Sequence, residues 1–311
     1  MMGTDAKVLY IAGYGRSGST LLERILGQFE GFFPVGELET IWHYGFVDNH
    51  LCACGQSFSD CDFWQSVVKE GLQPGHDFDL NEIAAIKKYL RFRRVPQLSM
   101  PCLTTTKMRN ALSQYARLRS RLLSAIQKVS GAKVIIDSSK SPVVLYALNE
   151  VDHIDYHVVH LVRDSRGVAF SWLRKKPALI SKNKAHYLSR FNVASSSLIW
   201  SEYNLLIEAY GQSKRLLGRV RYEDFIADPK GETLKILSGL GEKQGDLEFL
   251  EQSSVEFKTF HSLNGNPMRF QKGKVQLAPD EEWKQKMPKV KKAMVTAMTY
   301  PLLARYGYLK Q

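Results

Sequence analysis

Short apolar runs followed by small polar residues recur along this chain. The first run, residues 8–12, leads into a glycine-rich stretch at residues 13–20 and then into residues 21–26, whose apolar spacing suits a helix face. Residues 133–136 and 157–162 open two further units of the same kind. This succession predicts a three-layer α/β fold, a central parallel sheet flanked by helices. Ligands of such sheets lie beyond the carboxyl ends of the strands, so we expect the three polar turns to face one crevice.

The remaining pattern is mainly helical. A long helix is predicted over residues 104–129, ended by Gly131, and glycines and prolines mark an irregular loop over residues 43–80. Residues 219–225 predict a strand that turns into a loop, and the last helix extends to about Tyr306. The polar face of the long helix is basic and is either a solvated face or a rim that attracts an acidic acceptor; it comprises Lys107, Arg109, Arg117, Arg119 and Arg121.

The stretch from Gly13 to Thr20 predicts an anion site. A glycine turn between a strand and a helix aims backbone N–H groups and the positive end of the helix dipole at one point. The glycines have dinucleotide-binding spacing, but the second strand with its acidic residue is missing. Ser19 stands where the loop of nucleotide triphosphatases has its lysine, and the cation of this loop is Arg16.

Two signatures, far apart in the chain, resemble those of sulfotransferases that use 3′-phosphoadenosine 5′-phosphosulfate (PAPS). Residues 16–20, Arg-Ser-Gly-Ser-Thr, resemble the 5′-phosphosulfate loop of that family. Its 3′-phosphate signature, a strand ending in V-R-[DN] with a serine eight residues after the arginine, is matched by Val162-Arg163-Asp164 and Ser171. The motif style is similar to bacterial and tyrosylprotein-type sulfotransferases.

The resemblance covers almost the whole chain and implies its organisation and activity. It implies one sulfotransferase domain over residues 1–311 with a P-loop NTPase-like fold, in which residues 43–130 form a mainly helical, acceptor-specific insertion. The implied reaction moves the sulfuryl group of PAPS to a hydroxyl of a carbohydrate, lipid or other small molecule and leaves 3′-phosphoadenosine 5′-phosphate (PAP). Sulfuryl carries less charge than phosphoryl, so arginine and lysine suffice and no metal is expected to be required.

The resemblance also implies the donor site. Arg163 and Ser171 would bind the 3′-phosphate, and Tyr222 would reach the adenine side of the donor. Gln271-Lys272-Gly273 is similar to the family's R-K-G contact to the 3′-phosphate; because glutamine replaces the arginine, Arg269 is expected to supply the charge. The expected donor-binding residues are Arg16, Ser17, Gly18, Ser19, Thr20, Arg163, Ser171, Tyr222, Arg269, Lys272 and Gly273.

Glu37 is the expected general base, because the tyrosylprotein branch has a catalytic glutamate in a similar Gly-Glu segment. Glu39 is a rival that would share a face with Glu37 if the segment is extended, and His261 is a weaker candidate. Lys140, in a Lys-Ser-Pro context like that of the same branch, would contact the bridging oxygen. Arg16 would add positive charge beside it.

The charge balance points to anionic partners without choosing among them. Lysine and arginine number 43 against 31 acidic residues in a chain of 311, a net charge of +12. A nucleic-acid-binding protein is one alternative, but the basic residues are spread over several helices and no recognised module is present, so we expect no nucleic-acid partner. A P-loop kinase is the other, and it would need the loop lysine.

Three of the four cysteines are close in the sequence. Cys52, Cys54 and Cys61 could form a zinc site with His43 or His50, or a disulfide. Paired zinc cysteines are normally separated by two or more residues, so ordinary reduced cysteines are favoured.

No transmembrane segment or leader is expected. No apolar run approaches the roughly 18 residues of a membrane helix. The first predicted strand begins at Val8, which leaves no room before it for a secretory leader. We therefore expect a cytoplasmic protein.

Overall fold

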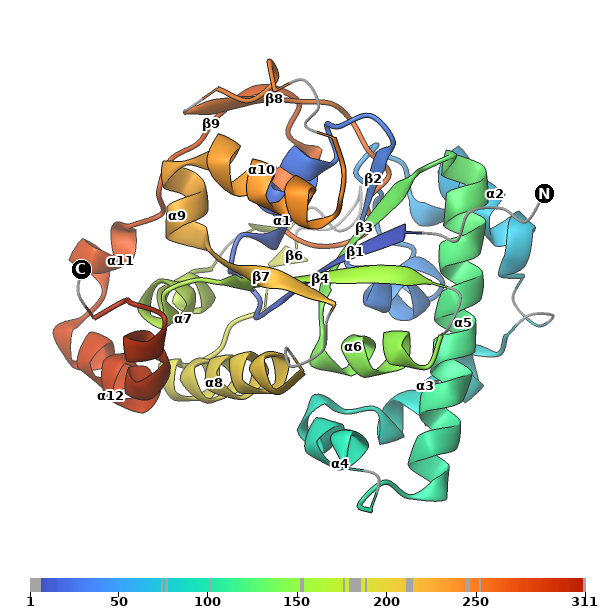
Figure 1. Ribbon diagram of the computed structural model, residues 1–311, viewed down its shortest axis with the longest axis horizontal. Coiled ribbons are helices and arrows are strands. Elements are labelled where there is room, and N and C mark those ends of the chain that lie inside the picture. Colours follow the sequence, from blue (N-terminus) through green and yellow to red (C-terminus); the bar gives the residue numbers. More distant parts are fainter. Residues whose placement is uncertain are drawn as a thin grey trace.

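Five parallel strands form the central sheet of the chain, confirming the predicted fold class (Figure 1). The computed structural model describes residues 7–73, 75, 78–100, 102–151, 154–175, 177–178, 186–187, 189–210, 215–243, 247–251 and 253–309. Across the sheet the strands are β2 (Phe32–Gly36), β3 (Val134–Lys140), β1 (Lys7–Gly13), β4 (Asp155–Val162) and β7 (Leu216–Arg221). The strand order changes direction at β1, where an open parallel sheet forms its ligand crevice.

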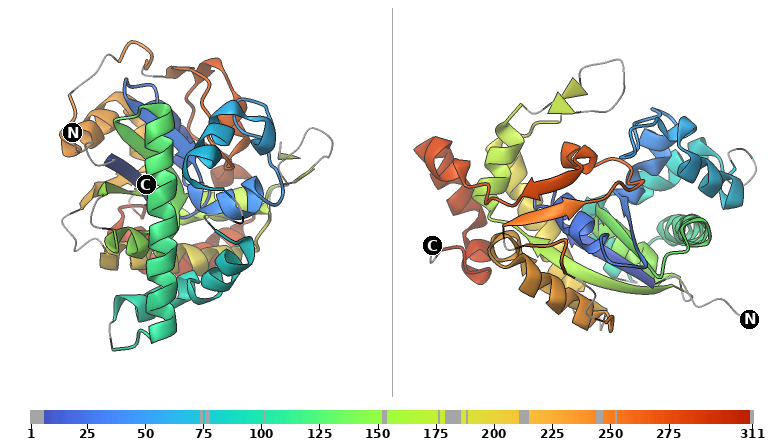
Figure 2. Two further views of the ribbon diagram at one scale, coloured as in Figure 1. Left: turned by 90° about the vertical axis from the view of Figure 1, so that its right-hand side faces the viewer. Right: turned by 90° about the horizontal axis from the view of Figure 1, so that it is seen from above.

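Helices cover both faces of the sheet (Figure 1). One face carries α1 (Ser19–Leu26), α9 (Tyr222–Ala227) and α10 (Pro229–Gly239). The other carries α5 (Thr106–Ser130), α6 (Pro142–Asn149) and α8 (Val193–Tyr210). The left view of Figure 2 shows α5 upright along one side of the molecule.

Two further groups of helices pack on these layers. On α8 lie α7 (Ser165–Leu173) and α12 (Lys289–Arg305), with α11 (Glu282–Lys286) beside α7. On α5 lie α2 (Asp62–Gly71) and α3 (Leu80–Tyr89), and α4 (Val95–Ser99) contacts α6.

The remaining elements are short. They are the helical turns η1 (Leu38–Thr40), η2 (Ile41–Gly45), η3 (Phe58–Asp60), η4 (Phe92–Arg94) and η5 (Pro267–Phe270), and the antiparallel pairs β5 (Pro177–Ala178) with β6 (His186–Tyr187) and β8 (Ser254–Phe257) with β9 (Gly273–Gln276).

Alternate residues of β1 belong to two separate cores. Val8, Tyr10 and Ala12 pack into the core that includes α5 and α6. Leu9 and Ile11 pack into the core that includes α1, α9 and α10. Because the strand is covered on both faces, its sequence reads as a continuous apolar run, as the prediction assumed.

The carboxyl end of β3 corrects one prediction. Residues 137–140 were expected to form a polar turn, but they continue the strand and are buried. Buried Arg119 of α5 forms an ion pair with Asp137, and Ser139 donates its backbone N–H and its hydroxyl to Asp137 Oδ1. Arg119 therefore belongs to the interior and not to the basic face of the long helix.

Two segments expected to be loops contain helices. Within residues 43–80, α2 buries Trp64 and Val67 beside α5, a spacing too short for the sequence pattern to stand out. After β7 the chain enters α9 directly at Tyr222, without an intervening loop. Among the described helices, none combines the length and apolar character needed to cross a membrane.

Candidate active site

A cavity of about 710 Å³ opens where β1, β3 and β4 end. It is lined by Arg16 and Ser19 from the turn after β1, by Lys140 at the end of β3, and by Arg163 and Ser171 after β4. The three predicted polar segments therefore do face one crevice, which is the position that parallel sheets give to their ligands.

The glycine-rich turn wraps the amino terminus of α1. Gly18, the residue before the helix, has a φ of 93°, and a Cβ there would lie 2.5 Å from Cδ2 of Tyr222. Both the backbone conformation and the close approach of the ring therefore require glycine. Ser17 is buried, and its hydroxyl has no hydrogen-bond partner among the described residues. A buried hydroxyl without a partner is suited to a ligand that supplies one.

Arg16 places a poorly hydrated cation at the cavity wall. Its guanidinium carbon lies 4.5 Å from the ring centroid of Trp172. Its Nε atom is buried without a hydrogen-bond partner in the part of the chain that the structure describes. Burial lowers the pKa of Arg16, although the charge of Glu37 acts in the opposite direction. A desolvated cation of this kind interacts strongly with an anion.

Arg163 is held from three sides at the end of β4. It donates Nη1–H to the carbonyl of Arg16 at 3.2 Å and Nη2–H to the carbonyl of Asp280 at 2.8 Å. The carboxylate of Asp280 lies 3.2 Å away, and the Tyr222 ring lies 4.5 Å from the guanidinium carbon. Burial opposes the ionisation of Asp280, but Arg163 and Arg174 outweigh it and lower its pKa.

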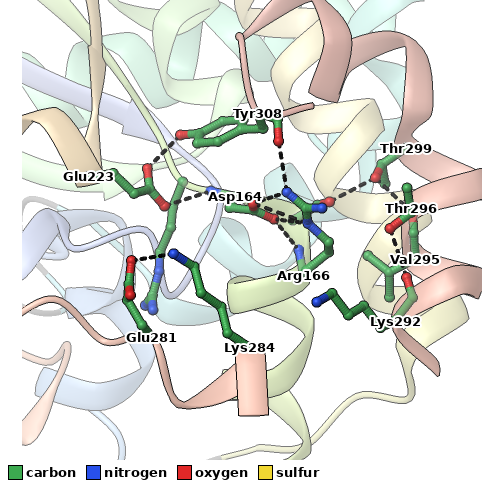
Figure 3. Close-up of polar contacts among 12 residues, drawn as sticks. Asp164, Arg166, Glu223, Glu281, Lys284, Lys292, Val295, Thr296, Thr299 and Tyr308 are labelled. Carbon is green, nitrogen blue, oxygen red and sulfur yellow. Dashed lines mark hydrogen bonds and ion pairs between the residues drawn. The ribbon is translucent and has the colours of Figure 1, made fainter. Parts of the chain in front are cut away.

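A network behind Arg163 fixes the turn that carries it (Figure 3). The Asp164 carboxylate accepts from the backbone N–H of Arg166 at 2.8 Å and pairs with its guanidinium. Arg166 also donates to the Tyr308 carbonyl at 2.9 Å, and the Tyr308 hydroxyl donates to Glu223 at 2.7 Å. Glu223 closes the circuit by accepting from the backbone N–H of Asp164. The aspartate of the Val-Arg-Asp motif is therefore a helix cap and an anchor rather than a ligand group.

Glu37 projects from the end of edge strand β2 toward β3. Gly36 has a φ of 79°, and a Cβ there would lie 2.4 Å from the Leu263 carbonyl oxygen, so the residue before Glu37 must be glycine. The backbone N–H of Glu37 donates to that carbonyl at 3.1 Å. Lys140 donates Nζ–H to Glu37 Oε1 at 2.6 Å, and both side chains line the cavity.

The backbone at Lys140 is left-handed, with a φ of 67°. The register between β1 and β3 slips after Tyr10 and Asp137, so that Ala12 pairs with Lys140. A left-handed residue other than glycine costs roughly 1–2 kcal/mol. Arg16 shares this conformation with a φ of 72°, and strained backbone of this kind concentrates at functional sites.

The structure separates Glu37 from its rivals. Leu38–Thr40 is a 3₁₀ turn, so Glu37 and Glu39 do not share the face of an extended segment. Glu39 is not among the residues that line the cavity, and its backbone N–H receives the Ser139 hydroxyl oxygen as acceptor at 2.8 Å. His261 is not among the lining residues either, and its Nδ1 lies 3.3 Å from Cys61 Sγ.

Three expected donor residues lie outside the cavity wall. Arg269 is buried and donates to the carbonyls of Gly265 and Leu51. Lys272 is exposed, and Gly273 pairs with Phe257 in the small sheet. These residues are therefore not brought to the other expected donor groups. Their local sequence resembled the family triplet, but the buried carbonyls already engage Arg269.

Other lining residues were not singled out from the sequence. Trp172 and Asp280 flank the two arginines, and Asn264 lies with its amide nitrogen 3.5 Å from Glu37 Oε2. An aromatic wall continues from the same cavity; it consists of Tyr44, Phe92, Trp172, Phe191 and Tyr203. A signal for Asn264 was present in the polar, glycine-rich composition of its segment, but the aromatic residues come from segments far apart in the chain.

The sequence was also compared with protein families. A model of the sulfotransferase family matches residues 9–246. This chain belongs to the sulfotransferase family. It is accordingly a transferase of sulfuryl groups. No curated protein matches the sequence.

Several solved structures resemble this sulfotransferase at low sequence identity. The sulfotransferase domain of the Synechococcus PCC 7002 olefin synthase is 18% identical, with 96% of each chain covered and a TM-score of 0.44. The sulfotransferase domain from the curacin biosynthetic pathway is 15% identical over 94% of this chain and 96% of that one, with a TM-score of 0.48. Sulfotransferase STF1 from Mycobacterium tuberculosis H37Rv is 18% identical over 78% and 69%, with a TM-score of 0.38.

Proposed function

We propose that this sulfotransferase transfers the sulfuryl group of PAPS to a hydroxyl of a small acceptor. The observation that carries the proposal is the convergence of Arg16, Arg163 and the Glu37–Lys140 pair on one cavity of about 710 Å³. Two separated anion-binding groups suit a donor with phosphate at two positions, and a carboxylate between them suits a hydroxyl acceptor.

The residues around the turn after β1 fit the 5′ end of the donor. Ser17 offers a buried hydroxyl, and Arg16 offers a buried Nε, neither with a partner in the described residues. Ser19 and Thr20 begin α1, where the helix dipole favours an anion. Arg163 and Ser171 would bind the 3′-phosphate, with Tyr222 positioned against Arg163.

Glu37 takes the proton of the acceptor hydroxyl as that oxygen attacks sulfur. A new S–O bond forms to the acceptor while the S–O bond to the 5′-phosphate breaks, and the bonding electron pair stays on the phosphate oxygen of PAP. Lys140 and Arg16 stabilise the negative charge that develops on this oxygen. The proton on Glu37 passes to solvent when the product leaves.

The acceptor would occupy the aromatic side of the cavity, lined by Tyr44, Phe92, Phe191 and Tyr203. Tyr44 and Phe92 come from residues 43–130, which supports the expectation that this segment determines acceptor choice. Aromatic rings favour an acceptor with an apolar face, such as a phenol, a lipid or the carbon face of a sugar.

A thermal-shift comparison of PAP, ATP, NAD and single-stranded DNA tests the donor. A ligand at 100 times its Kd stabilises the folded chain by about 2.7 kcal/mol. We expect a melting temperature several degrees higher with micromolar PAP and little change with the other three. Stabilisation by ATP equal to that by PAP would contradict the proposal, because ATP lacks the 3′-phosphate.

Incubation with labelled PAPS and panels of phenolic, lipid and carbohydrate acceptors tests the reaction. The label should move to a hydroxyl of one acceptor class. A chain that binds PAP but transfers label to water alone would leave the donor site supported and contradict the acceptor chemistry.

A further inference from the structure

Four side chains with metal-binding atoms converge behind the cavity wall. They are Cys52, Cys54, Cys61 and His261, and their sulfur and ring nitrogen atoms all lie within 4.8 Å of one another. Cys52 and Cys61 are buried, while Cys54 and His261 are half-buried. The histidine is 200 residues beyond Cys61 in the chain, so it could not be chosen as a partner from sequence spacing.

The distances match the edges of a zinc tetrahedron. With Zn–S bonds of about 2.3 Å and Zn–N bonds of about 2.0–2.1 Å, two sulfurs lie about 3.8 Å apart and a sulfur and a nitrogen about 3.6 Å apart. The sulfurs of Cys54 and Cys61 are 3.8 Å apart. The Nδ1 atom of His261 lies 3.8 Å from the sulfur of Cys52 and 3.3 Å from that of Cys61.

The backbone explains how cysteines one residue apart can share an ion. Cys52 and Gly55 close a tight turn, in which the backbone N–H of Gly55 donates to the Cys52 carbonyl at 2.8 Å. Cys61 then comes from the residue that precedes α2, and Phe63 of that helix stacks on the His261 ring at 5.1 Å. The turn and the stacked ring hold all four groups toward one point.

We propose that Cys52, Cys54, Cys61 and His261 bind one Zn²⁺ ion with tetrahedral geometry. The three thiols release their protons to solvent on binding, because the thiolate is the metal ligand. Sulfur and imidazole ligands select zinc over magnesium or calcium. Four protein ligands complete the coordination shell and leave no position for water or substrate, which is the arrangement of structural sites.

The ion would join two segments that build the catalytic cavity. The backbone N–H of Ala53 donates to the Ser262 carbonyl at 3.0 Å, and Cys52 pairs with Leu263 in a β-bridge. Leu263 in turn accepts the backbone N–H of Glu37. The zinc would therefore hold the backbone that positions Glu37, while the sulfuryl transfer itself would still use only side-chain cations.

This interpretation replaces the expectation of ordinary reduced cysteines. It also differs from a disulfide between Cys54 and Cys61, which would remove two of the four ligands and leave Cys52 and His261 without a shared ion. The inference does not depend on the identity of the sulfuryl donor or acceptor, so metal content can be measured without any activity assay.

Metal analysis of the full-length chain, purified without chelators, tests the inference. We expect about one zinc ion per chain in the wild type and in Cys102→Ser, because Cys102 is exposed and lies outside the cluster. Cys54→Ser, at a half-buried ligand, should lose most of the zinc. Chelation should lower the melting temperature of the wild type, and Zn²⁺ should restore it.

Cobalt provides a second readout that needs no variant. Co²⁺ added to the chelator-treated wild type should give the visible bands of a tetrahedral site and the near-ultraviolet charge transfer of thiolate ligands, and Zn²⁺ should remove both. The inference is overturned if the reduced wild type contains no zinc and gives no such cobalt spectrum. A Cys54–Cys61 disulfide, found by peptide mass mapping of the freshly purified chain, would overturn it as well.

Discussion

The ammonium nitrogen of Lys140 lies 2.6 Å from Oε1 of Glu37, although the two residues are 103 positions apart in the sequence. Lysine has three N–H donors. One is used by Glu37 and one by the Ser138 carbonyl at 2.8 Å, which leaves one for a ligand among the contacts of the described residues. The pair can therefore orient a base and contact a departing oxygen at the same time.

Replacing Glu37 tests the base directly. Glu37→Gln keeps the side-chain shape and removes the proton acceptor, so kcat should fall by about 10²–10⁴-fold. PAP affinity should change little, because the lost interaction is made chiefly in the transition state. Steady-state kinetics and PAP titration measure the two quantities.

Two matched variants accompany Glu37→Gln. Glu39→Gln should be mild, since Glu39 does not line the cavity. His261→Ala should lose metal before it loses chemistry. If Glu37→Gln turns over near the wild-type rate while either of these variants is inactive, Glu37 is not the base.

A double-mutant cycle tests whether Glu37 and Lys140 act as a unit. Lys140→Met keeps the length of the side chain but removes its charge, and it should lower kcat/KM on its own. If the pair acts together, Glu37→Gln/Lys140→Met should be about as slow as the slower single variant. Multiplicative losses in the four-protein comparison would show that the residues act independently.

Arg163 should be specific for the 3′-phosphate. Arg163→Ala should weaken PAP by roughly 1.5–3 kcal/mol, the range for a hydrogen bond to a charged group. Adenosine 5′-phosphosulfate, which lacks the 3′-phosphate, should bind about equally well to the variant and the wild type. Calorimetric titration with both ligands measures the difference.

The control for Arg163 is Arg174→Ala. Arg174 shares the carboxylate of Asp280 at 2.8 Å but does not line the cavity. Its removal should leave PAP affinity nearly unchanged. Equal losses of both ligands in Arg163→Ala would assign the arginine to the shape of the cavity instead of the 3′-phosphate.

Local signals predicted much of this fold. Gly13 to Thr20 are contiguous, and their strand-turn-helix order determines where an anion would bind. The Val-Arg-Asp strand end is equally local, and the structure places Arg163 beside the turn through its bond to the Arg16 carbonyl. Such features follow from neighbouring residues and the parallel sheet, so the sequence carries them.

Features that depend on distant partners were missed or misread. Asp137 reads as a turn residue until Arg119 is found beside it in the core. The three cysteines read as poorly spaced because the fourth group, His261, arrives from the far end of the chain. Arg269 and Lys272 matched a family pattern locally, yet the fold directs them elsewhere. Tertiary contacts outweighed local pattern in each case.

A buried acid beneath the site makes stability depend on pH. Glu23 of α1 is buried near Lys140 and Glu37. Burial raises the pKa of Glu23 to about 8, although a hydrogen bond with Ser138 and the charge of Lys140 act to lower it. Between the ordinary carboxyl pKa of about 4.5 and this value, the folded chain keeps a proton that the unfolded chain releases. The free energy of unfolding should therefore decrease as the pH rises through this window.

Glu23→Gln removes this ionisation while keeping the shape of the side chain. Its melting temperature relative to the wild type should be similar near pH 5 and higher near pH 8, because the wild type alone loses stability as Glu23 ionises on unfolding. Each unit of pKa shift corresponds to about 1.4 kcal/mol, so the gain should amount to a few kcal/mol at most. Glu30→Gln, at an exposed glutamate just after the same helix, should show no such pH dependence, because its side chain meets solvent in both states. A Glu23→Gln variant whose advantage is equal at both pH values would show that Glu23 is ionised in the folded chain.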